Sequence, residues 1–242
     1  MSLLSMIRTY NKARKPPTCT AVIAAAGISQ RCEGEDKLFY RIKEKPVLAH
    51  TIDAFQKCDL INDIIIVARE DMFEPITDIC TKYRFSKVSK VMKGGQTRTE
   101  SVMNGIYAAS KKAYLIAVHD GARPCVDVDT ITRTIKTAKI TQAAAPAIPI
   151  TSTVKRVENT IISETVDREE LFEIQTPQVF RLEIIKAALS NVLKKSIDIT
   201  DDCRAAEIIG VPVHIVEGSR RNIKITTIED LSIAEAFINM ED

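Results

Sequence analysis

The sequence has little that would suggest a metal centre, a membrane segment or a nucleic-acid surface. Its six cysteines form no C-x-x-C pair, and its three histidines (His50, His119 and His214) lie far apart in the chain, so no zinc knuckle, redox pair or histidine-based metal site is indicated. No apolar run is long enough to span a bilayer, and a net charge of +2 gives no strong field for nucleic acid or an anionic membrane. We therefore predict unpaired thiols in a reducing cytoplasm, with no nucleic-acid or membrane partner.

Several catalytic motifs are missing as well. No G-x-x-x-x-G-K-[ST] sequence occurs, which excludes a P-loop ATPase, and no G-x-G-x-x-G follows the first strand, which argues against a dinucleotide oxidoreductase. No Ser/His/Asp or Cys/His arrangement is present. We interpret His119 as a hydrogen-bonded buried residue rather than a general base.

The chain is long enough for one large α/β domain or two small ones, with 242 residues, 45% apolar and 27% charged. Residues 1–18 are basic, contain no acidic residue and lack a secretory apolar region, so they are expected to form an extension before the first strand; import into an organelle is the alternative. We predict a single domain over residues 19–242, with no repeat or linker.

The stretch from Thr20 to Lys37 carries the first functional signal. An apolar run over residues 21–24 indicates a buried strand, the small residues 25–27 let a backbone approach a ligand closely, and the loop that follows holds Arg31 and Lys37. A strand that runs into such a loop can cradle a phosphate. The alternative is a first strand that ends on glycine without binding any nucleotide, as in many α/β proteins.

Apolar runs alternate with helical patterns along the chain, which predicts a mostly parallel twisted sheet with helices on both faces. Strands are expected at 63–68, 86–92, 114–118 and 213–216, helices at 46–57, 74–83, 97–110, 182–193, about 200–209 and 227–239, and an extended segment at 222–225. Ligands of such sheets bind outside the carboxyl ends of the strands. Residues 25–27, 94–95 and 119–124 all follow strands and should therefore meet in one crevice.

Residues 150–173 break this alternation. Their period-two pattern around Glu158-Asn159 predicts a β-hairpin that is too polar for the main core. We expect it to project as an arm and to pack on a partner.

The polar residues expected at the crevice are mainly cations. They are Arg31, Lys37, Arg98, Asp120, Arg123 and Lys224. An excess of cations suits a polyphosphate that undergoes phosphoryl or nucleotidyl transfer. Asp120 could hold Mg²⁺ or a ligand hydroxyl, and a structural pair with Arg123 is the alternative. The remaining aspartates near helix starts are interpreted as caps and solvated surface: Asp127, Asp129, Asp201 and Asp202.

Taken in order, the motifs resemble those of one nucleotidyltransferase family. They are AAAG-x-x-x-R (24–31) with Lys37, GG-x-x-R-x-x-SV (94–102), HDGARP (119–124), T-x-KR (153–156), TVDR (165–168), TPQ-x-F (176–180), TDD (200–202) and EG-x-x-x-NIK-x-T (217–226). Together they resemble the 2-C-methyl-D-erythritol 4-phosphate cytidylyltransferases of the non-mevalonate isoprenoid pathway, from about Ala21 to near the C-terminus.

The resemblance implies a Rossmann-like nucleotidyltransferase fold, a homodimer clasped by the β-arm, and Mg²⁺-dependent reaction of CTP with 2-C-methyl-D-erythritol 4-phosphate to give the CDP-alcohol and pyrophosphate. The catalytic residues implied are Arg31, Lys37, Arg168 and Lys224. The nucleotide-binding residues implied are Ala24, Ala25, Ala26, Gly27, Gly94, Gly95, Ser101, Asp120 and Gly121. The residues implied for the methylerythritol phosphate are Asp120, Arg123, Thr153, Arg168, Thr176 and Lys224, with Thr153 and Arg168 supplied across the dimer, and Asp120 lies near the metal.

The first loop departs from the usual pattern of that family. Ala24 stands where the family usually has proline, Ser29 where it has glycine, and Asp36-Lys37-Leu38 where it has Pro-Lys-Gln. A serine in place of glycine should stiffen the loop, and Asp36 should partly offset the charge of Lys37.

Two alternatives remain from the sequence. A cytidylyltransferase for another polyol phosphate, such as ribitol 5-phosphate, would share the fold and the first loop, and HDGARP with TVDR favours methylerythritol. A non-catalytic nucleotide-binding protein would explain the altered loop, but the presence of Arg31, Lys37 and Lys224 argues against it.

Overall fold

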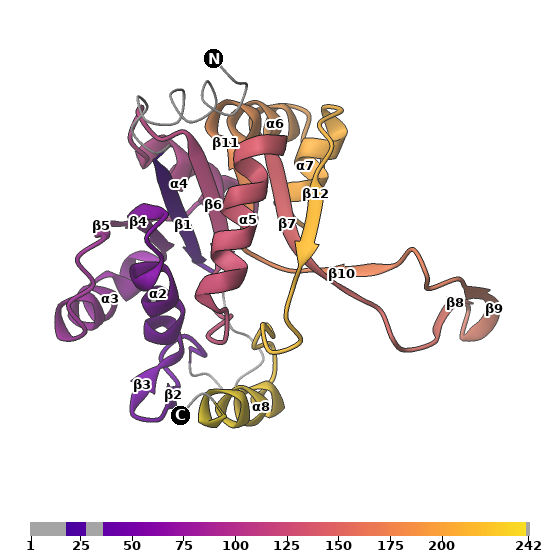
Figure 1. Cartoon of the computed structure of the whole chain (residues 1–242), viewed down its shortest axis with the longest axis horizontal. Helices are drawn as coiled ribbons and strands as arrows, with labels where there is room; N and C mark the ends of the chain where they lie inside the picture. Colours follow the sequence, from indigo (N-terminus) through magenta and orange to yellow (C-terminus); the bar gives the residue numbers. More distant parts are fainter. Residues whose placement is uncertain (1–17, 28–35, 241–242) are drawn as a thin grey trace, which may run out of the picture.

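The computed structural model describes residues 18–27 and 36–240. Within these residues an eight-stranded sheet runs in the order β10-β7-β11-β6-β1-β4-β5, and β12 also pairs with β7 (Figure 1). Its strands are β1 (Cys19–Ala25), β4 (Ile61–Ala68), β5 (Val88–Lys93), β6 (Leu115–Asp120), β7 (Ala143–Pro149), β10 (Phe172–Ile174), β11 (Gln178–Arg181) and β12 (His214–Glu217). Two short strands, β2 (Arg41–Ile42) and β3 (Lys45–Pro46), pair with each other.

The centre of the sheet is parallel and buried on both faces. β1 lies between β4 and β6 and pairs in parallel with both. Consecutive side chains of a strand point to opposite faces, so a continuous apolar run is stable only when both faces are covered. Ile65 and Val67 of β4 belong to one core cluster, and Ile64 and Ile66 belong to the other.

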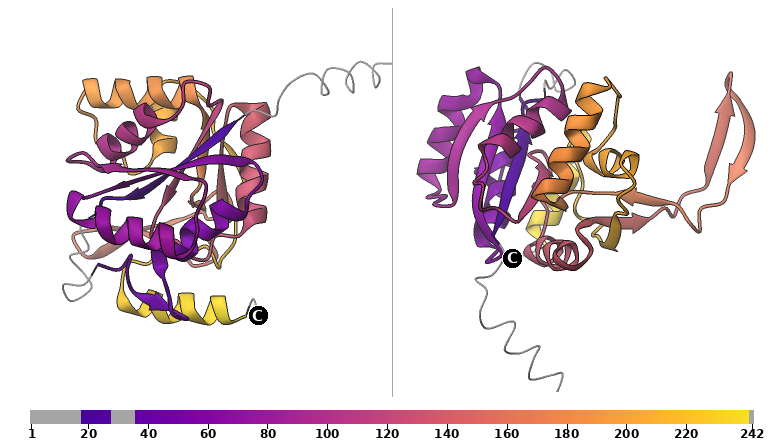
Figure 2. Two further views of the ribbon diagram at one scale, coloured as in Figure 1. Left: turned by 90° about the vertical axis from the view of Figure 1, so that its left-hand side faces the viewer. Right: turned by 90° about the horizontal axis from the view of Figure 1, so that it is seen from above.

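Helices cover both faces (Figure 2). One core cluster takes side chains from α2 (Val47–Lys57), α3 (Phe73–Lys82), α5 (Val128–Thr141) and α8 (Ile228–Asn239). The other takes them from α4 (Arg98–Ala108), α6 (Leu182–Lys194) and α7 (Asp202–Ile208), and a short 3-10 turn, η1 (Glu70–Met72), precedes α3. The predicted fold class is therefore confirmed.

Part of the second half of the sheet was not predicted. β7 has the sequence AAAPAIP, and alanine and proline are depleted in strands, so its pattern is weak. α5 is rich in β-branched Thr and Ile, which lower helix propensity. Burial decides both cases: Ile131, Ile135 and Ala138 of α5 and Ala143–Ala145 of β7 are buried, and β11 runs antiparallel between β6 and β7.

The predicted arm is present. β8 (Val154–Glu158) and β9 (Ile161–Val166) form an antiparallel hairpin that projects away from the body of the molecule (Figures 1 and 2). The predicted turn at Glu158-Asn159 is displaced by one residue, because Glu158 ends β8 and the turn is made by Asn159 and Thr160, whose φ angles are 49° and 69°. Positive φ at both positions matches the right-handed twist of hairpin strands.

The predicted absence of cysteine pairing holds for the part of the chain that is described, where five cysteines are free thiols. In the same part, every helix is too short or too polar to cross a bilayer.

Candidate active site

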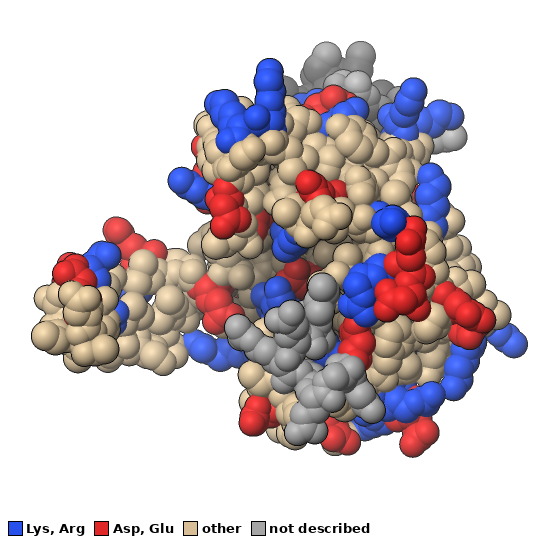
Figure 3. Space-filling model, turned by 180° about the vertical axis from the view of Figure 1, so that it is seen from behind, with Lys and Arg blue, Asp and Glu red and all other residues tan. Residues whose placement is uncertain are grey.

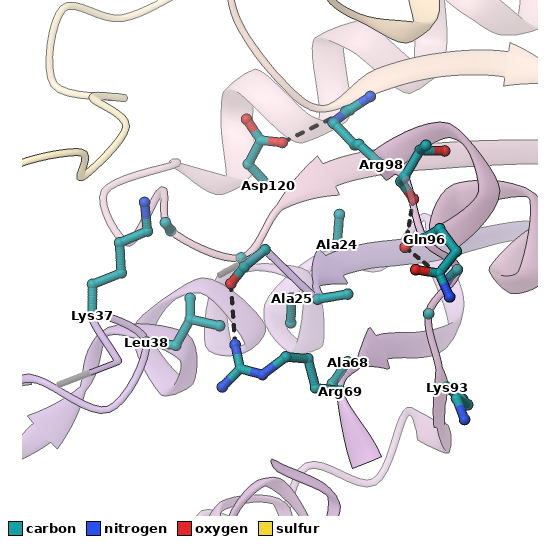
Figure 4. Close-up of a pocket in the computed structure, with 18 of the residues that line it drawn as sticks. Ala24, Ala25, Lys37, Leu38, Ala68, Arg69, Lys93, Gln96, Arg98 and Asp120 are labelled. Atoms are coloured by element: carbon teal, nitrogen blue, oxygen red, sulfur yellow. Dashed lines mark hydrogen bonds and ion pairs between the residues drawn. The ribbon is translucent and has the colours of Figure 1, made fainter. Parts of the chain in front are cut away.

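A pocket of about 550 Å³ opens at the carboxyl ends of the central strands. Three segments that the sequence placed together contribute to its lining: residues 24–27 at the end of β1 and just beyond it, residues 93–98 at the end of β5 and beyond it, and residues 120–122 at the end of β6 and just beyond it. Lys37, which Figure 4 labels, also lines the pocket. Lys224 lines it as well. The strand-end argument thus predicted the location of the pocket.

One wall of the pocket is built from backbone and small side chains. A Cβ on Gly94 would lie 2.7 Å from the Cβ of Ala26 and 2.8 Å from Oγ of Ser101, so only glycine fits where the two segments meet. Ser101 Oγ accepts from Gly95 N–H at 3.0 Å and donates to the Thr97 carbonyl at 2.9 Å. Its hydroxyl therefore holds the turn that precedes α4.

The start of α4 faces the same pocket. Thr97 caps the helix: its Oγ1 accepts from Glu100 N–H at 3.1 Å, and the Glu100 carboxylate accepts from Thr97 N–H and Gln96 N–H at 3.2 and 2.6 Å. This reciprocal capping fixes the turn from which Arg98 projects.

Asp120, the last residue of β6, lies at the centre of a cationic cluster. Its carboxylate lies 3.0 Å from Lys224 Nζ, 3.5 Å from a terminal nitrogen of Arg98 and 3.5 Å from Arg123 Nε. Burial alone would raise the pKa of Asp120, but Lys224, Arg98 and Arg123 outweigh burial and hold it far below the usual range. Asp120 is therefore a permanent carboxylate that positions three cations.

Arg98 joins this cluster to the first residue of α7, Asp202. Its guanidinium also pairs with Asp202 at 2.8 Å, and these carboxylates outweigh burial and raise the pKa of Arg98. Asp202 is wholly buried, so its interpretation as solvated surface was wrong. The Gln178 side-chain oxygen accepts from the N–H groups of Asp202 and Cys203, and Asp201 is the helix cap that was predicted.

Lys37 and Lys224 both line the pocket, although they lie far apart in the sequence. Lys37 Nζ donates to the carbonyl of Ile225, the residue after Lys224, at 2.8 Å. Ile225 N–H in turn donates to the Ala122 carbonyl at 2.9 Å. The segment 222–225 was expected to be extended; it forms no strand and is held by these bonds beside the end of β6.

Arg123 and Thr176 lie behind Asp120 rather than in the pocket wall. Arg123 donates to the Asn222 carbonyl at 2.7 Å, and Thr176 Oγ1 accepts from Asp120 N–H at 3.2 Å and bonds His119 Nδ1 at 2.9 Å. Burial lowers the pKa of His119 to about 3. His119 is thus the buried, hydrogen-bonded residue expected from the sequence, while binding of a substrate by Arg123 and Thr176 stays a prediction.

The remaining predicted residues are not brought to this pocket. Thr153 and Arg168 are exposed on the arm, where Arg168 donates to the Thr151 carbonyl. Arg31 and Ser29 lie outside the described residues. Among the described residues, none from the arm lines the pocket of the same chain.

Sequence reasoning missed Arg69, which lines the pocket directly after β4. The signal was available, because residue 69 follows a buried apolar strand in the same way as residues 25–27 and 120. Asp36 was expected to offset part of the charge of Lys37. Its carboxylate instead pairs with Arg69 at 3.1 Å.

The described residues contain no group of three or more His, Cys, Asp or Glu side chains able to hold a metal ion. Mg²⁺ commonly binds through one or two carboxylates together with substrate phosphates and water. Asp120, as a permanent carboxylate in the pocket wall, fits the part of a single protein ligand to a metal held mainly by phosphates.

Comparisons with known proteins agree with this geometry. A sequence model of the family 2-C-methyl-D-erythritol 4-phosphate cytidylyltransferase matches residues 19–240. Proteins of that name from Dehalococcoides mccartyi strain CBDB1 and Clostridium acetobutylicum are 41% identical over 219 residues and 42% identical over 221 residues, in each case over 90% of this chain and 95% and 96% of the relative.

Solved structures give the same result. The 4-diphosphocytidyl-2C-methyl-D-erythritol synthase of Anaerococcus prevotii superposes with a TM-score of 0.83 at 30% identity, over 93% of this chain and 97% of that one. The Thermus thermophilus 2-C-methyl-D-erythritol 4-phosphate cytidylyltransferase gives 0.77 at 29% identity, over 90% and 98%. This chain belongs to the 2-C-methyl-D-erythritol 4-phosphate cytidylyltransferase family.

Proposed function

We propose that this protein transfers the cytidylyl group of CTP to 2-C-methyl-D-erythritol 4-phosphate and releases pyrophosphate. One observation carries the proposal: Lys37, Lys224 and Asp120 line a single pocket at the carboxyl ends of the strands, in a chain that belongs to a family named for this reaction. The pocket has the cations that two phosphorylated substrates require.

In this transfer an oxygen of the acceptor's phosphate attacks the α-phosphorus of CTP. The bond from that phosphorus to the bridging oxygen breaks, pyrophosphate leaves with the electron pair, and a phosphoanhydride forms. The nucleophile is already an anion, so no general base is needed. The barrier lies in bringing two anions together, and fixed positive charges lower it.

We assign the charge-stabilising roles to the cations of the pocket and the first loop. Lys37, together with Arg31, would stabilise the negative charge at the α-phosphorus. Lys224 would hold the nucleotide phosphate and the incoming phosphate in line, oriented by its 3.0 Å pair with Asp120. Main-chain groups of residues 25–27 and 94–95 would bind the nucleotide, since small residues allow close approach there.

We further propose Mg²⁺ as the metal, held by the CTP phosphates and by Asp120. When bound, it would neutralise phosphate charge as a Lewis acid. Arg123, which pairs with the Asp120 carboxylate, would keep it oriented toward the pocket, and Thr176 would hold the backbone of Asp120 through its N–H.

The arm supports a homodimer as part of the same proposal. Val157, Ile161 and Ile162 are 54%, 71% and 61% exposed, and apolar side chains in such a cluster favour an interface. Thr153 and Arg168 would then reach the acceptor site of the partner. A cytoplasmic location stays a prediction.

A pyrophosphate-release assay tests the function. The purified chain is given CTP and MgCl₂ with 2-C-methyl-D-erythritol 4-phosphate, with ribitol 5-phosphate, or with no acceptor. We expect release only with the first acceptor. Release with ribitol 5-phosphate alone would move the assignment to the other polyol, and no release while CTP binds would favour a non-catalytic nucleotide-binding protein.

A further inference from the structure

Arg69 holds together the two ends of the first loop. Its guanidinium donates to the Gly27 carbonyl at 3.2 Å and pairs with the Asp36 carboxylate at 3.1 Å. Gly27 is the last described residue before the segment 28–35, and Asp36 is the first one after it. The same guanidinium makes two further bonds of 3.2 Å to Asp71.

Arg69 stands between Asp36 and the pocket. Arg69 lines the pocket and Asp36 does not (Figure 4 shows the Arg69 side chain beneath Lys37 and Leu38). The Asp36 side chain is only 14% exposed, so water screens its charge poorly. Its second oxygen accepts from Leu38 N–H at 3.1 Å, which fixes the carboxylate beside the backbone of Lys37.

An unpaired carboxylate at this place would oppose the function of the pocket. A charge that is little exposed acts at a lower effective dielectric constant than one in bulk water, so it would repel the phosphates of CTP. It would also attract Lys37, which is needed for those phosphates. With Arg69 in place, Asp36 is neutralised by a residue from a different segment, the one that follows β4.

We propose that Arg69 is a positioning residue for nucleotide binding, which keeps the charge of Asp36 away from the CTP phosphates and from Lys37. The inference rests on the proposed function for the identity of the nucleotide. It concerns the acidic residue, Asp36, that directly precedes the lysine of the first loop.

The test is a set of charge-changing variants whose affinity for CTP is measured by titration calorimetry in the presence of MgCl₂. Arg69→Gln should raise the Kd for CTP about tenfold, which corresponds to about 1.4 kcal/mol. Asp36→Asn alone should leave the Kd within about twofold of wild type. Asp36→Asn combined with Arg69→Gln should restore it to within about threefold, although the double variant still lacks the arginine.

Asp71→Asn is the matched control. Asp71 contacts the same guanidinium, but its side chain is 68% exposed and lies in water, so removing its charge should leave the Kd for CTP unchanged. Arg69→Lys, which keeps the charge, should retain most of the affinity.

Two results would overturn the proposal. One is wild-type CTP affinity in Arg69→Gln; the other is a folded double variant that binds CTP as weakly as Arg69→Gln does. Melting temperatures identify any loss of folding. The proposed function fails separately, if the wild-type chain binds CTP normally but transfers nothing to the polyol phosphate.

Discussion

The pocket and the arm are built in opposite ways. In the pocket, charged groups are partly buried and paired within one chain: the Asp120 side chain is 12% exposed and pairs with three cations. In the arm, apolar side chains face water, and β8 and β9 pair only with each other among the described strands. Figure 3 shows charges of both signs crowded into the central hollow, whereas most of the arm's visible surface carries no charge.

The contrast shows that one chain pairs the charges of its own pocket but leaves the apolar side chains of its arm uncovered. A cluster of fixed charges needs no rearrangement when charge develops in a transition state, so the pocket is already organised for phosphate chemistry. An isolated two-stranded hairpin is marginally stable in water, so the arm gains from covering its apolar side chains. We therefore predict that a pocket variant lowers the activity of its own chain's site, whereas an arm variant lowers the activity of the site in the partner chain.

The largest expected effect comes from removing a cation of the pocket. Lys37→Ala or Lys224→Ala should lower kcat by about 10²–10³-fold, because each removes a fixed charge worth about 2.7–4 kcal/mol in the transition state. Steady-state pyrophosphate release measures the loss, and thermal melting should show that both variants stay folded.

Lys93 supplies the matched control for that experiment. It also lines the pocket, but its pair with Glu70 is exposed, at 66% and 65% of the two side chains. Lys93→Ala should change kcat less than about threefold, since exposed ion pairs contribute about 0–1 kcal/mol. Wild-type turnover in Lys37→Ala and Lys224→Ala would remove both lysines from the mechanism.

A smaller effect is expected from Arg168 of the arm. A charge-assisted hydrogen bond contributes about 1.5–3 kcal/mol, so Arg168→Ala should lower kcat/KM for the polyol phosphate by about 10–100-fold, mainly through KM. The KM for CTP should remain near that of wild type, because Arg168 is exposed on the arm and does not line the nucleotide pocket.

Co-expression of Arg168→Ala with Lys224→Ala tells whether the arm serves its own chain or a partner. In a mixed dimer, one site combines an intact pocket with an intact arm. About a quarter of wild-type activity should therefore return, since about half of the dimers are mixed and one of their two sites is intact. Activity no higher than that of the separate variants would mean that the arm does not cross to a partner.

The sequence was sufficient to predict the pocket where residues follow buried strands. Asp120 ends β6, and residues 24–27 span the end of β1 and the two residues after it, so topology alone brings them together. Long-range pairs were not predictable in this way. Asp202 was interpreted as solvated because its partner Arg98 lies 104 positions earlier in the chain, and neither residue alone shows that the two meet.

The elements that were missed share a physical cause. The strand AAAPAIP and the Thr-rich helix after Asp127 have poor intrinsic propensities, and burial between the sheet and its covering layer stabilises them. Asp127 itself was predicted as a cap, and its side chain accepts from Thr130 N–H at 2.5 Å. A cap at Asp127 was thus anticipated, but the helix that it begins was not predicted, because that helix depends on tertiary contacts.

The smallest effect concerns His119, which lies buried behind the pocket and sharpens the comparison with the exposed arm. Burial lowers its pKa from 6.5 to about 3, partly opposed by Asp120 and assisted by Arg123, so below pH 6.5 the unfolded chain takes up a proton that the folded chain does not. Stability should then be lost as pH falls, by about 1.4 kcal/mol per unit from this residue. Urea unfolding at pH 7.5 and 5.5 should show about 1.4 kcal/mol more loss in wild type than in His119→Asn. Other titrating groups, including His50, are common to both proteins and cancel in this difference. Equal losses would mean that His119 is charged in the folded protein.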